Sequence, residues 1–513
     1  MEPDRQVEIQ LGHLCTNRCV FCVSGQRNEL GTAGPLEAAA LLTSIEQARE
    51  AGHERITLLG GEPTIQPGFM DAVRRCVGLG YEEIVIFTNG VKTARPSFVD
   101  EVLATGGSFT WRLSIQGADK ISHEQTTRRP GSFGRILASL ENLAARNQTI
   151  TVNTCMVRSN YRSVDRFPDL LLPFDVKQLH LDMVRPRDAG ERKPKELEEI
   201  IPRYAKMVPA LERMISGFES KAPGFDVNIG NYPPCLAPEL ARWIRHDGET
   251  TETVAIDGTD RLSKPWNKYE VKARDKIKPS RCRECVLADR CSGVYETYAR
   301  IHGIEDLSPI SRARLAAVDP SRMLLPQHVA HLKPAVMHTK WPAPLSEASW
   351  STTGDNEVTI TLHGPEAIVV SLRPPSHIGC AACDLFSLHI RKAPASHKLA
   401  MSALELLWRV LAKDSVPWHP LGTDAVVTPP GSMGRQLARL RRAAPFPPLV
   451  WSATEVRPGK AEIHLDGPSG EQVVFWLEPR GRRTGGGYRI EKGPASPEVR
   501  EGMRALMNAL SSR

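Results

Sequence analysis

Residues 6–22, QVEIQLGHLCTNRCVFC, join a short β-branched run to three closely spaced thiols. The run Val7–Leu11 predicts a β-strand, and Cys15, Cys19 and Cys22 follow it with three and then two intervening residues. Thiolates are the usual ligands of iron–sulfur clusters, whereas a structural zinc site normally takes four ligands, and no fourth candidate lies nearby. The spacing therefore predicts a cluster bound through three irons, with one iron open to a small molecule. Three buried or zinc-binding thiols are the alternative.

Outward from this stretch, strand-like runs alternate with helical runs over the first 190 residues, with helices expected at 35–51, 69–79 and 133–146. Repeated strand–helix units indicate a parallel sheet, and six of them predict an α/β fold, a partial (β/α)6 TIM-like barrel. In such barrels the chemistry lies at the carboxyl ends of the strands. The expected strands are Val7–Leu11, Ile56–Leu59, Ile84–Phe87, Trp111–Ile115, Thr149–Thr154 and Lys177–Asp182.

Polar motifs follow the later strands of this predicted barrel. The sequence GGEPT at residues 60–64 comes after the second strand, where its glycines allow close backbone approach to a ligand and Glu62 can accept hydrogen bonds from an ammonium group. The sequence TNG at residues 88–90 closes the third strand, and LSIQG at residues 113–117 closes the fourth. These motifs predict a ligand site at the strand ends.

Together, the cysteine spacing and these motifs resemble the radical S-adenosylmethionine (radical SAM) superfamily over about residues 5–190. The resemblance implies a [4Fe-4S] cluster on the three thiols and reductive cleavage of S-adenosylmethionine to methionine and a 5′-deoxyadenosyl radical. That radical would take a hydrogen atom from a substrate, which the protein positions and shields from solvent. For Arg128 and Asn153 a structural role is the equal alternative, and no catalytic residue can be named. The residues implied in binding S-adenosylmethionine are Gly60, Gly61, Glu62, Pro63, Thr88, Asn89, Ser114, Gln116, Arg128 and Asn153.

A second cysteine cluster lies in an irregular region rich in Pro, Gly and Cys, at about residues 223–310. Cys282, Cys285 and Cys291 have a C-x2-C-x5-C spacing. This spacing resembles SPASM, an auxiliary-cluster extension of radical SAM enzymes, or its shortened Twitch form. A full SPASM domain carries a further cysteine where this chain has Tyr295, so the full pattern is broken. The resemblance implies one fully ligated auxiliary [4Fe-4S] cluster, with zinc as the alternative.

The fourth ligand of this auxiliary cluster is expected to be Cys235. Cys380 or Cys383 could supply the thiolate instead, or could form a redox or metal pair, although two partly buried thiols are the simpler interpretation. Cys76 in a helix and Cys155 at a strand end are expected to be structural free thiols.

Composition limits the class of protein. The 513 residues suggest three or four domains, and 41% hydrophobic with 24% charged residues is ordinary globular usage. The net charge of +7 is too dilute to argue for nucleic-acid binding. No apolar run approaches the length of a membrane span, and the polar start lacks the apolar region of a signal peptide. We therefore expect a cytoplasmic protein, in which eleven cysteines suit metal ligation better than disulfides.

The C-terminal part contains a duplication at an offset of about one hundred residues. Trp350-Ser351 recurs as Trp451-Ser452, and the segment 362–365 recurs as 465–468. Each copy predicts several strands and then a helix, which is a small α+β module, and one long helix is expected over residues 194–218. The predicted boundaries are a barrel at 1–222, an auxiliary-cluster domain at 223–311, a linker at 312–344, a first module at 345–415, a linker at 416–444 and a second module at 445–513.

Two classes of function compete. SPASM-like extensions resemble those of peptide maturases, which favours hydrogen abstraction from a peptide or protein, as in the modification of ribosomally made peptides. Twitch-like relatives favour a small molecule such as a sugar, a nucleotide or an antibiotic precursor. An iron–sulfur electron carrier would not need the three strand-end motifs. The expected partners are the substrate and an electron donor, either a reductase or a flavodoxin or ferredoxin, with neither membrane nor nucleic acid.

Overall fold

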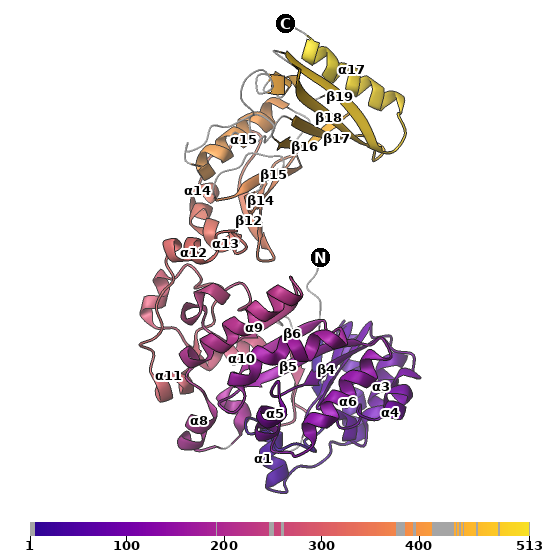
Figure 1. The fold of residues 1–513 in the computed structure, drawn as a ribbon, viewed down its shortest axis with the longest axis vertical. Helices are drawn as coiled ribbons and strands as arrows, with labels where there is room; N and C mark the ends of the chain where they lie inside the picture. Colours follow the sequence, from indigo (N-terminus) through magenta and orange to yellow (C-terminus); the bar gives the residue numbers. More distant parts are fainter. Residues whose placement is uncertain are drawn as a thin grey trace. The chain divides into compact units, whose positions relative to one another are not determined.

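The structure is a computed structural model, and the chain forms two compact units, residues 1–311 and 312–513, which are described separately (Figure 1). Cys380 and Cys383 lie outside the described residues. Within the described part, no helix has the length and apolar character needed to span a membrane. The described residues are 6–190, 192–245, 251–257, 261–375, 385–392, 397–412, 436–437, 439–440, 443–444, 446–457, 460–480 and 483–511.

A nine-stranded sheet forms the centre of the first unit, in the order β7-β6-β5-β4-β3-β2-β1-β8-β9. The first seven strands are parallel and lie in chain order, β8 pairs parallel with β1, and β9 pairs antiparallel with β8. Parallel strands in chain order with helical crossovers are the arrangement of a partial barrel, so the predicted fold class is confirmed. The strands are β1 (Gln6–Gln10), β2 (Arg55–Leu59), β3 (Glu83–Thr88), β4 (Phe109–Ser114), β5 (Thr149–Met156), β6 (Gln178–Met183), β7 (Asp226–Gly230), β8 (Glu252–Val254) and β9 (Trp266–Asn267).

Alternation along the strands separates an apolar from a polar face. Val7 and Ile9 of β1 are fully buried in the core that the sheet shares with its helices, whereas Glu8 between them is a buried carboxylate. Successive side chains of a strand point to opposite faces, so Glu8 faces away from that apolar layer. The helices of this unit are α1 (Val23–Glu29), α2 (Ala38–Glu50), α3 (Phe69–Gly78), α4 (Pro96–Leu103), α5 (Lys120–Thr127), α6 (Ser132–Ala144), α7 (Phe167–Leu171), α8 (Pro194–Ile200), α9 (Val208–Lys221), α10 (Lys268–Arg274) and α11 (Glu296–His302).

The prediction of one long helix over residues 194–218 is wrong. Helix α8 ends at Ile200, a 3₁₀ turn η5 (Tyr204–Met207) follows, and α9 starts at Val208. The cause is Pro202, because proline disfavours helical backbone at the residue before it. Ile201 accordingly has φ −81° and ψ 113°, which is extended backbone.

The region after residue 222, which the sequence predicts to be irregular, also contributes strands to the barrel sheet. Strands β7, β8 and β9 come from residues 226–267, beyond the boundary expected at residue 222. The remaining short elements are η6 (Pro234–Leu236), η7 (Pro238–Leu240), β10 (Lys276–Ile277), η8 (Ser280–Glu284) and β11 (Val294–Tyr295), of which β10 and β11 pair antiparallel.

The second unit contains two four-stranded antiparallel sheets, each followed by a helix and each with a core of its own. The segment 312–344, expected to be a linker, holds three helices, and Leu325, Val329 and Val336 from it pack in the core of the first sheet. The elements are α12 (Arg312–Val318), α13 (Leu325–Val329), α14 (Lys333–Met337), β12 (Ala348–Thr353), β13 (Glu357–Leu362), β14 (Ile368–Arg373), β15 (Ser387–Lys392), α15 (His397–Ala412), β16 (Val450–Arg457), β17 (Lys460–Asp466), β18 (Gln472–Arg480), β19 (Arg483–Lys492) and α17 (Pro497–Ser511).

Candidate functional site

The cysteine loop, residues 13–22, connects β1 to α1 and carries the three N-terminal thiols. Cys22 is the N-cap residue of α1. Asn28 of α1 holds the loop from the other side: its side-chain amide donates to the carbonyl of His13 (2.6 Å), and its carbonyl accepts from the N–H of Cys15 (3.2 Å). The thiols are therefore gathered at the carboxyl end of β1, where parallel barrels place their chemistry.

Two further contacts fix the cysteine loop. The N–H of Arg18 donates to the carbonyl of Thr127 at the end of α5 (2.9 Å). A Cβ atom on Gly25 would lie 2.9 Å from the carbonyl oxygen of Cys19, so α1 approaches the loop this closely only because residue 25 is glycine. The loop is thus held by its own helix and by the end of a second one.

The three thiols lie in an environment that disfavours unpaired thiolates. Burial, reinforced by Glu62, raises the pKa of Cys15 to about 12. Burial and the neighbouring thiols Cys22 and Cys15 raise the pKa of Cys19 well above its ordinary value, and burial raises that of Cys22. Metal binding requires deprotonated thiols and supplies the positive charge that stabilises them. Three thiols gathered on one short loop fit a cluster that keeps one iron open.

The glycines of the GGEPT motif bring the end of β2 against the cysteine loop. Gly60 has φ +104°, and a Cβ on Gly61 would lie 2.3 Å from the carbonyl oxygen of Leu14. The N–H of Glu62 donates to that same carbonyl (2.8 Å). The sequence predicts that these glycines admit a ligand; in the structure Gly61 admits the backbone of the cysteine loop, and Gly60 admits the backbone of residues 10–12 just before it.

The carboxylate of Glu62 is fully buried and joins two motifs. Its Oε1 accepts from the hydroxyls of Thr64 (2.5 Å) and Thr88 (2.6 Å), and its Oε2 accepts from the N–H of Asn89 (2.6 Å). Burial raises the pKa of this carboxyl, and the hydrogen bonds oppose that rise. Since each carboxylate oxygen has two lone pairs, Oε2 keeps acceptor capacity for a further donor such as an ammonium group.

Asn89 connects this carboxylate to the first thiol. Its side-chain amide lies 3.6 Å from Sγ of Cys15 and donates to the hydroxyl of Thr16 (3.2 Å). Glu62, Asn89 and Cys15 therefore form one continuous group built from the ends of β1, β2 and β3.

Ser114 is the last residue of β4 and Gln116 follows it, whereas Asn153 lies inside β5, which continues to Met156. Ser114 of β4 and Asn153 of β5 are partners in the sheet register. Gln116 is buried; its amide donates to Oγ of Ser114 (2.7 Å), and its carbonyl accepts from the N–H of Cys155 (3.0 Å). Gln116 thus fastens the end of β4 to β5, a structural contact that the sequence does not indicate.

Arg128 is placed apart from the Glu62–Asn89–Cys15 group. It ends α5 in a left-handed conformation, φ 51°, and its guanidinium pairs with Glu29 of α1 at 2.7 Å. The side chain is 53% exposed. An anionic partner is therefore already present, and a role toward S-adenosylmethionine would require that pair to open.

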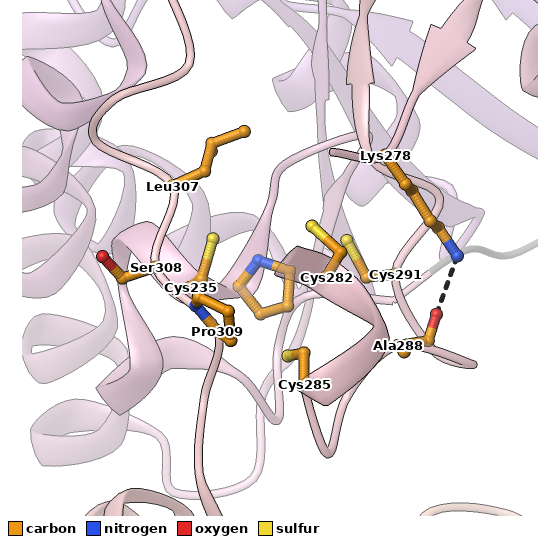
Figure 2. Close-up of a pocket in the computed structure, with 10 residues that line it drawn as sticks. Cys235, Lys278, Cys282, Cys285, Ala288, Cys291, Leu307, Ser308 and Pro309 are labelled. Atoms are coloured by element: carbon orange, nitrogen blue, oxygen red, sulfur yellow. Dashed lines mark hydrogen bonds between the residues drawn. The ribbon is translucent and has the colours of Figure 1, made fainter. Parts of the chain in front are cut away.

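Four thiols of the second cysteine cluster line one pocket (Figure 2). Cys235 lies in η6 and Cys282 in η8. Cys285 directly follows η8, and Cys291 lies in the segment before β11. We refer to these residues as the auxiliary pocket. The structure therefore brings the expected fourth thiol, Cys235, to the other three.

Backbone amides point at the sulfurs of the auxiliary pocket. The N–H of Ile310 donates to Sγ of Cys285 (3.3 Å), and the N–H of Gly293 donates to Sγ of Cys291 (3.3 Å). Burial raises the pKa of Cys235 to about 12, with Cys291 contributing. Four thiols with N–H donors fit a fully ligated iron–sulfur cluster, because such donors stabilise negative sulfur and tune its reduction potential.

Tyr295 occupies the position at which a full SPASM pattern has a cysteine. Its side chain is 1% exposed, and the ammonium of Lys276 lies 5.0 Å from the centre of its ring.

Among the described residues, no three His, Cys, Asp or Glu side chains converge in the manner that a single bound metal ion needs.

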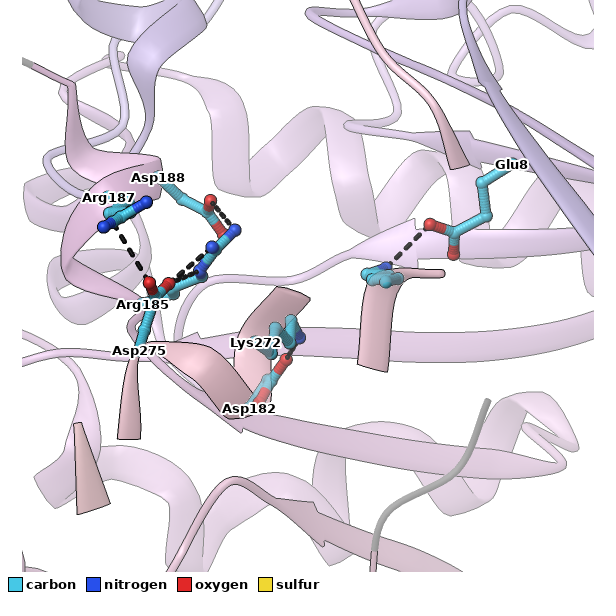
Figure 3. A network of polar contacts seen from close by, with 8 residues as sticks. Glu8, Asp182, Arg185, Arg187, Asp188, Lys272 and Asp275 are labelled. Carbon is cyan, nitrogen blue, oxygen red and sulfur yellow. Dashed lines mark hydrogen bonds and ion pairs between the residues drawn. The ribbon is translucent and has the colours of Figure 1, made fainter. Parts of the chain in front are cut away.

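A charged cluster that no sequence motif indicates lies near the carboxyl ends of β6 and β7 (Figure 3). Asp182 of β6 accepts from Lys272 of α10 (3.0 Å) and from the amide of Asn231. The ammonium of Lys276 donates to the carbonyl of Asn231 and to the hydroxyl of Ser292 (2.5 Å). Burial lowers the pKa of Lys276 to about 8.

The same cluster extends to the loop after β6. Arg185 pairs with Asp275 (2.5 Å) and Asp188 (3.3 Å), and Arg187 pairs with Asp275 (3.1 Å). No local motif marks these residues, because the partners are separated by up to 90 positions in the chain. The term barrel-end cluster is used below for Asp182, Arg185, Arg187, Asp188, Lys272, Asp275 and Lys276.

Comparison with known proteins matches residues 9–171 to the family described as the radical SAM superfamily. The AdoMet-dependent heme synthase of Methanosarcina barkeri is 26% identical over 188 residues, which cover 37% of this chain and 52% of that protein. The PqqA peptide cyclase of Methylorubrum populi is 26% identical over 172 residues, covering 34% of this chain and 44% of that protein. The chain thus spans about half the length of these curated relatives.

Among solved structures, Streptococcus suis SuiB bound to S-adenosylmethionine aligns with a TM-score of 0.43 and 16% identity. The alignment covers 60% of this chain and 76% of that one.

Proposed function

We propose that this protein, whose residues 9–171 match the radical SAM superfamily, is an enzyme that reductively cleaves S-adenosylmethionine to abstract hydrogen from a peptide or protein. The observation that carries the proposal is the junction of the cysteine loop with Glu62 and Asn89. It joins three thiols to a buried carboxylate through backbone and side-chain contacts from three strand ends.

Cys15, Cys19 and Cys22 would hold a [4Fe-4S] cluster. When bound, that group supplies the electron for cleavage of the sulfonium of S-adenosylmethionine. Glu62 would accept a hydrogen bond from the amino group of S-adenosylmethionine with the free acceptor site on Oε2. Asn89 orients Glu62 through its backbone N–H and orients Cys15 through its side chain. Gln116, with Ser114 at the end of β4 and Asn153 within β5, would position the remaining polar groups.

Cys235, Cys282, Cys285 and Cys291 would hold a second, fully ligated [4Fe-4S] cluster. Four thiols in one pocket, with backbone amide donors on the sulfurs of Cys285 and Cys291, support this assignment over a site with an open position. Zinc is the alternative occupant, since four thiolates also make a structural zinc site, although the described side chains do not converge as a single ion requires. Iron, sulfide and zinc analysis after anaerobic reconstitution distinguishes the two.

A peptide or protein substrate is favoured by the auxiliary pocket, which resembles the extension of peptide maturases. The likeness to a PqqA peptide cyclase supports the same class. The likeness to an AdoMet-dependent heme synthase favours the second candidate, a small-molecule substrate. We further propose that a reductase or a flavodoxin or ferredoxin delivers the electron in the cytoplasm.

The test is an anaerobic assay with S-adenosylmethionine, a reductant and candidate substrates. The proposal expects 5′-deoxyadenosine, and a mass change in a peptide encoded beside the gene. Formation of 5′-deoxyadenosine with a change only in a small molecule would favour the second candidate. Absence of 5′-deoxyadenosine from protein with a full complement of iron and sulfide would contradict both.

A further inference from the structure

Two buried tyrosine hydroxyls in the first unit have no hydrogen-bond partner among the described residues. They belong to Tyr204 and Tyr295, whose side chains are each 1% exposed. The ring of Tyr204 stacks on Tyr298 with centres 3.9 Å apart, and the ring of Tyr295 lies beneath the ammonium of Lys276. Nearly all buried polar groups of native proteins find a partner, because an unpaired one is costly. A bound ligand would be the missing partner.

The place of these hydroxyls is the carboxyl end of the barrel. Burial raises the pKa of both phenols, and the carboxylate of Asp182 in β6 raises both further. Tyr204 also interacts with Cys155 at the end of β5, and Cys155 interacts with Cys22 of the cysteine loop. Ser292, the partner of Lys276, directly follows a thiol of the auxiliary pocket. Tyr295 lies beneath Lys276, and the carbonyl of Tyr204 accepts from Tyr232, the neighbour of the Lys276 acceptor Asn231. Both rings therefore lie near the carboxyl ends of β6 and β7, where a parallel barrel binds its substrate.

The charges of the barrel-end cluster indicate what kind of group would bind. Each carboxylate of the cluster lies within 3.3 Å of an arginine or lysine. Lys276 differs, because its hydrogen-bond acceptors, Asn231 and Ser292, are both neutral. Apart from the exposed pair Arg187 and Asp188, three cations (Arg185, Lys272 and Lys276) face two carboxylates (Asp182 and Asp275). One further anion would therefore balance the cluster. Two phenol hydroxyls and an ammonium are all donors, which suits an oxygen anion.

We propose that Lys276, Tyr204 and Tyr295 bind a carboxylate of the substrate at the carboxyl end of the barrel. This deepens the proposed function and rests on it, because it names the substrate as a molecule that carries a carboxylate. The contact positions the substrate: binding energy from a group remote from the reacting bond holds the hydrogen atom to be removed in place.

The binding test uses the full-length, anaerobically reconstituted protein and two matched pairs of probes. N-acetylglycine and its amide mimic a peptide C-terminus with and without its charge; N-acetylglutamate amide and N-acetylglutamine amide do the same for an acidic side chain. Ligand-observed NMR is expected to detect the carboxylate of at least one pair and not its neutral partner, and the pair that responds identifies the source. Lys276→Met should weaken that binding about tenfold or more, and Tyr204→Phe and Tyr295→Phe each severalfold.

Thermal unfolding without probe separates binding from a structural role. Tyr204→Phe and Tyr295→Phe remove a hydroxyl that has no partner, so their unfolding temperature should equal or exceed that of the unmodified protein. Tyr232→Phe is the matched control, because its hydroxyl donates to the carbonyl of Tyr204 (3.0 Å), and it should unfold at a lower temperature.

Three results would overturn the inference. The neutral probes could bind as tightly as the carboxylates. The two tyrosine variants could be destabilised as much as Tyr232→Phe. Lys276→Met could keep carboxylate binding and change only the reduction potential of the auxiliary cluster, which would make Lys276 a counter-ion of that cluster. The readouts do not require S-adenosylmethionine cleavage: carboxylate binding without cleavage contradicts only the proposed function, and cleavage without carboxylate binding contradicts only this inference.

Discussion

The cysteine loop and the auxiliary pocket gather their thiols in opposite ways. The loop takes three thiols from eight consecutive residues and fixes them through contacts with neighbouring strand ends. The auxiliary pocket takes four thiols from residues 235–291 and fixes them through turns and backbone amides. A compact triad beside a buried carboxylate suits a cluster that still binds a small molecule, whereas four dispersed thiols suit a closed one. Each prediction below tests this difference.

The largest effect is expected from removing the triad. The triple variant Cys15→Ala, Cys19→Ala, Cys22→Ala should form no 5′-deoxyadenosine above background under reducing, anaerobic conditions, because the thiolates that bind the cluster are gone. The measurement is chromatographic quantification of 5′-deoxyadenosine. Cys76→Ala is the matched control, since that thiol is buried in α3 away from both regions. Normal cleavage by the triple variant would refute the assignment.

Removal of the auxiliary thiols should have a narrower effect. The double variant Cys235→Ala, Cys291→Ala should still form 5′-deoxyadenosine when no substrate is present. It should no longer convert the substrate. Iron content should fall from roughly eight to about four per chain, since one of two four-iron clusters is lost. Iron, sulfide and zinc analysis measures this.

The same analysis can contradict the count for the unmodified protein. About four irons and one zinc would place zinc in the auxiliary pocket. About twelve irons would indicate a third cluster that involves Cys380 and Cys383.

A smaller effect is expected from Glu62→Gln. The amide keeps the shape but loses the charge, and one of its atoms becomes a donor facing Thr88 or Asn89. Charge-assisted hydrogen bonds contribute about 1.5–3 kcal/mol, so binding of S-adenosylmethionine should weaken roughly 10- to 100-fold. Equilibrium dialysis under anaerobic conditions measures it. The control Glu29→Gln removes an exposed carboxylate paired with Arg128 and should change binding little. Equal losses in both variants would contradict this role of Glu62, because removal of a distant exposed carboxylate would then weaken binding as much.

The smallest effect on the two cysteine regions is expected from removing the second unit. A chain that ends at Ser311 retains Ile310, whose N–H donates to Cys285, and keeps the whole core of the first unit. It should retain both clusters and cleave S-adenosylmethionine, yet lose turnover of the substrate if the two modules recognise it. Iron analysis and the two assays check this. Full turnover by the shortened chain would exclude that recognition role, and insolubility would mean that the modules only stabilise the fold.

The sequence predicted the parts of the fold that depend on local pattern. All six expected strands are present because β-branched runs bounded by turn residues determine them, whereas the helix over 194–218 fails at Pro202. Strand β8 was missed because only Glu252–Val254 forms it, and its pairing with β1 joins residues far apart in the chain. At the site, the motif residues were found, but the contacts that join Glu62 to Asn89 and Leu14 were not. The barrel-end cluster was missed entirely, because isolated Lys, Arg and Asp residues carry no pattern that reports their distant partners.

The central claim is that the cysteine loop keeps one coordination position open and the auxiliary pocket keeps none. Electron paramagnetic resonance of the reduced, fully reconstituted protein, recorded with and without S-adenosylmethionine, tests it most directly. The account predicts two cluster signals, of which one changes when S-adenosylmethionine is added and the other does not, with the changing signal absent from the triad variant. Two signals that both ignore S-adenosylmethionine, or a responsive signal that survives in the triad variant, would contradict it.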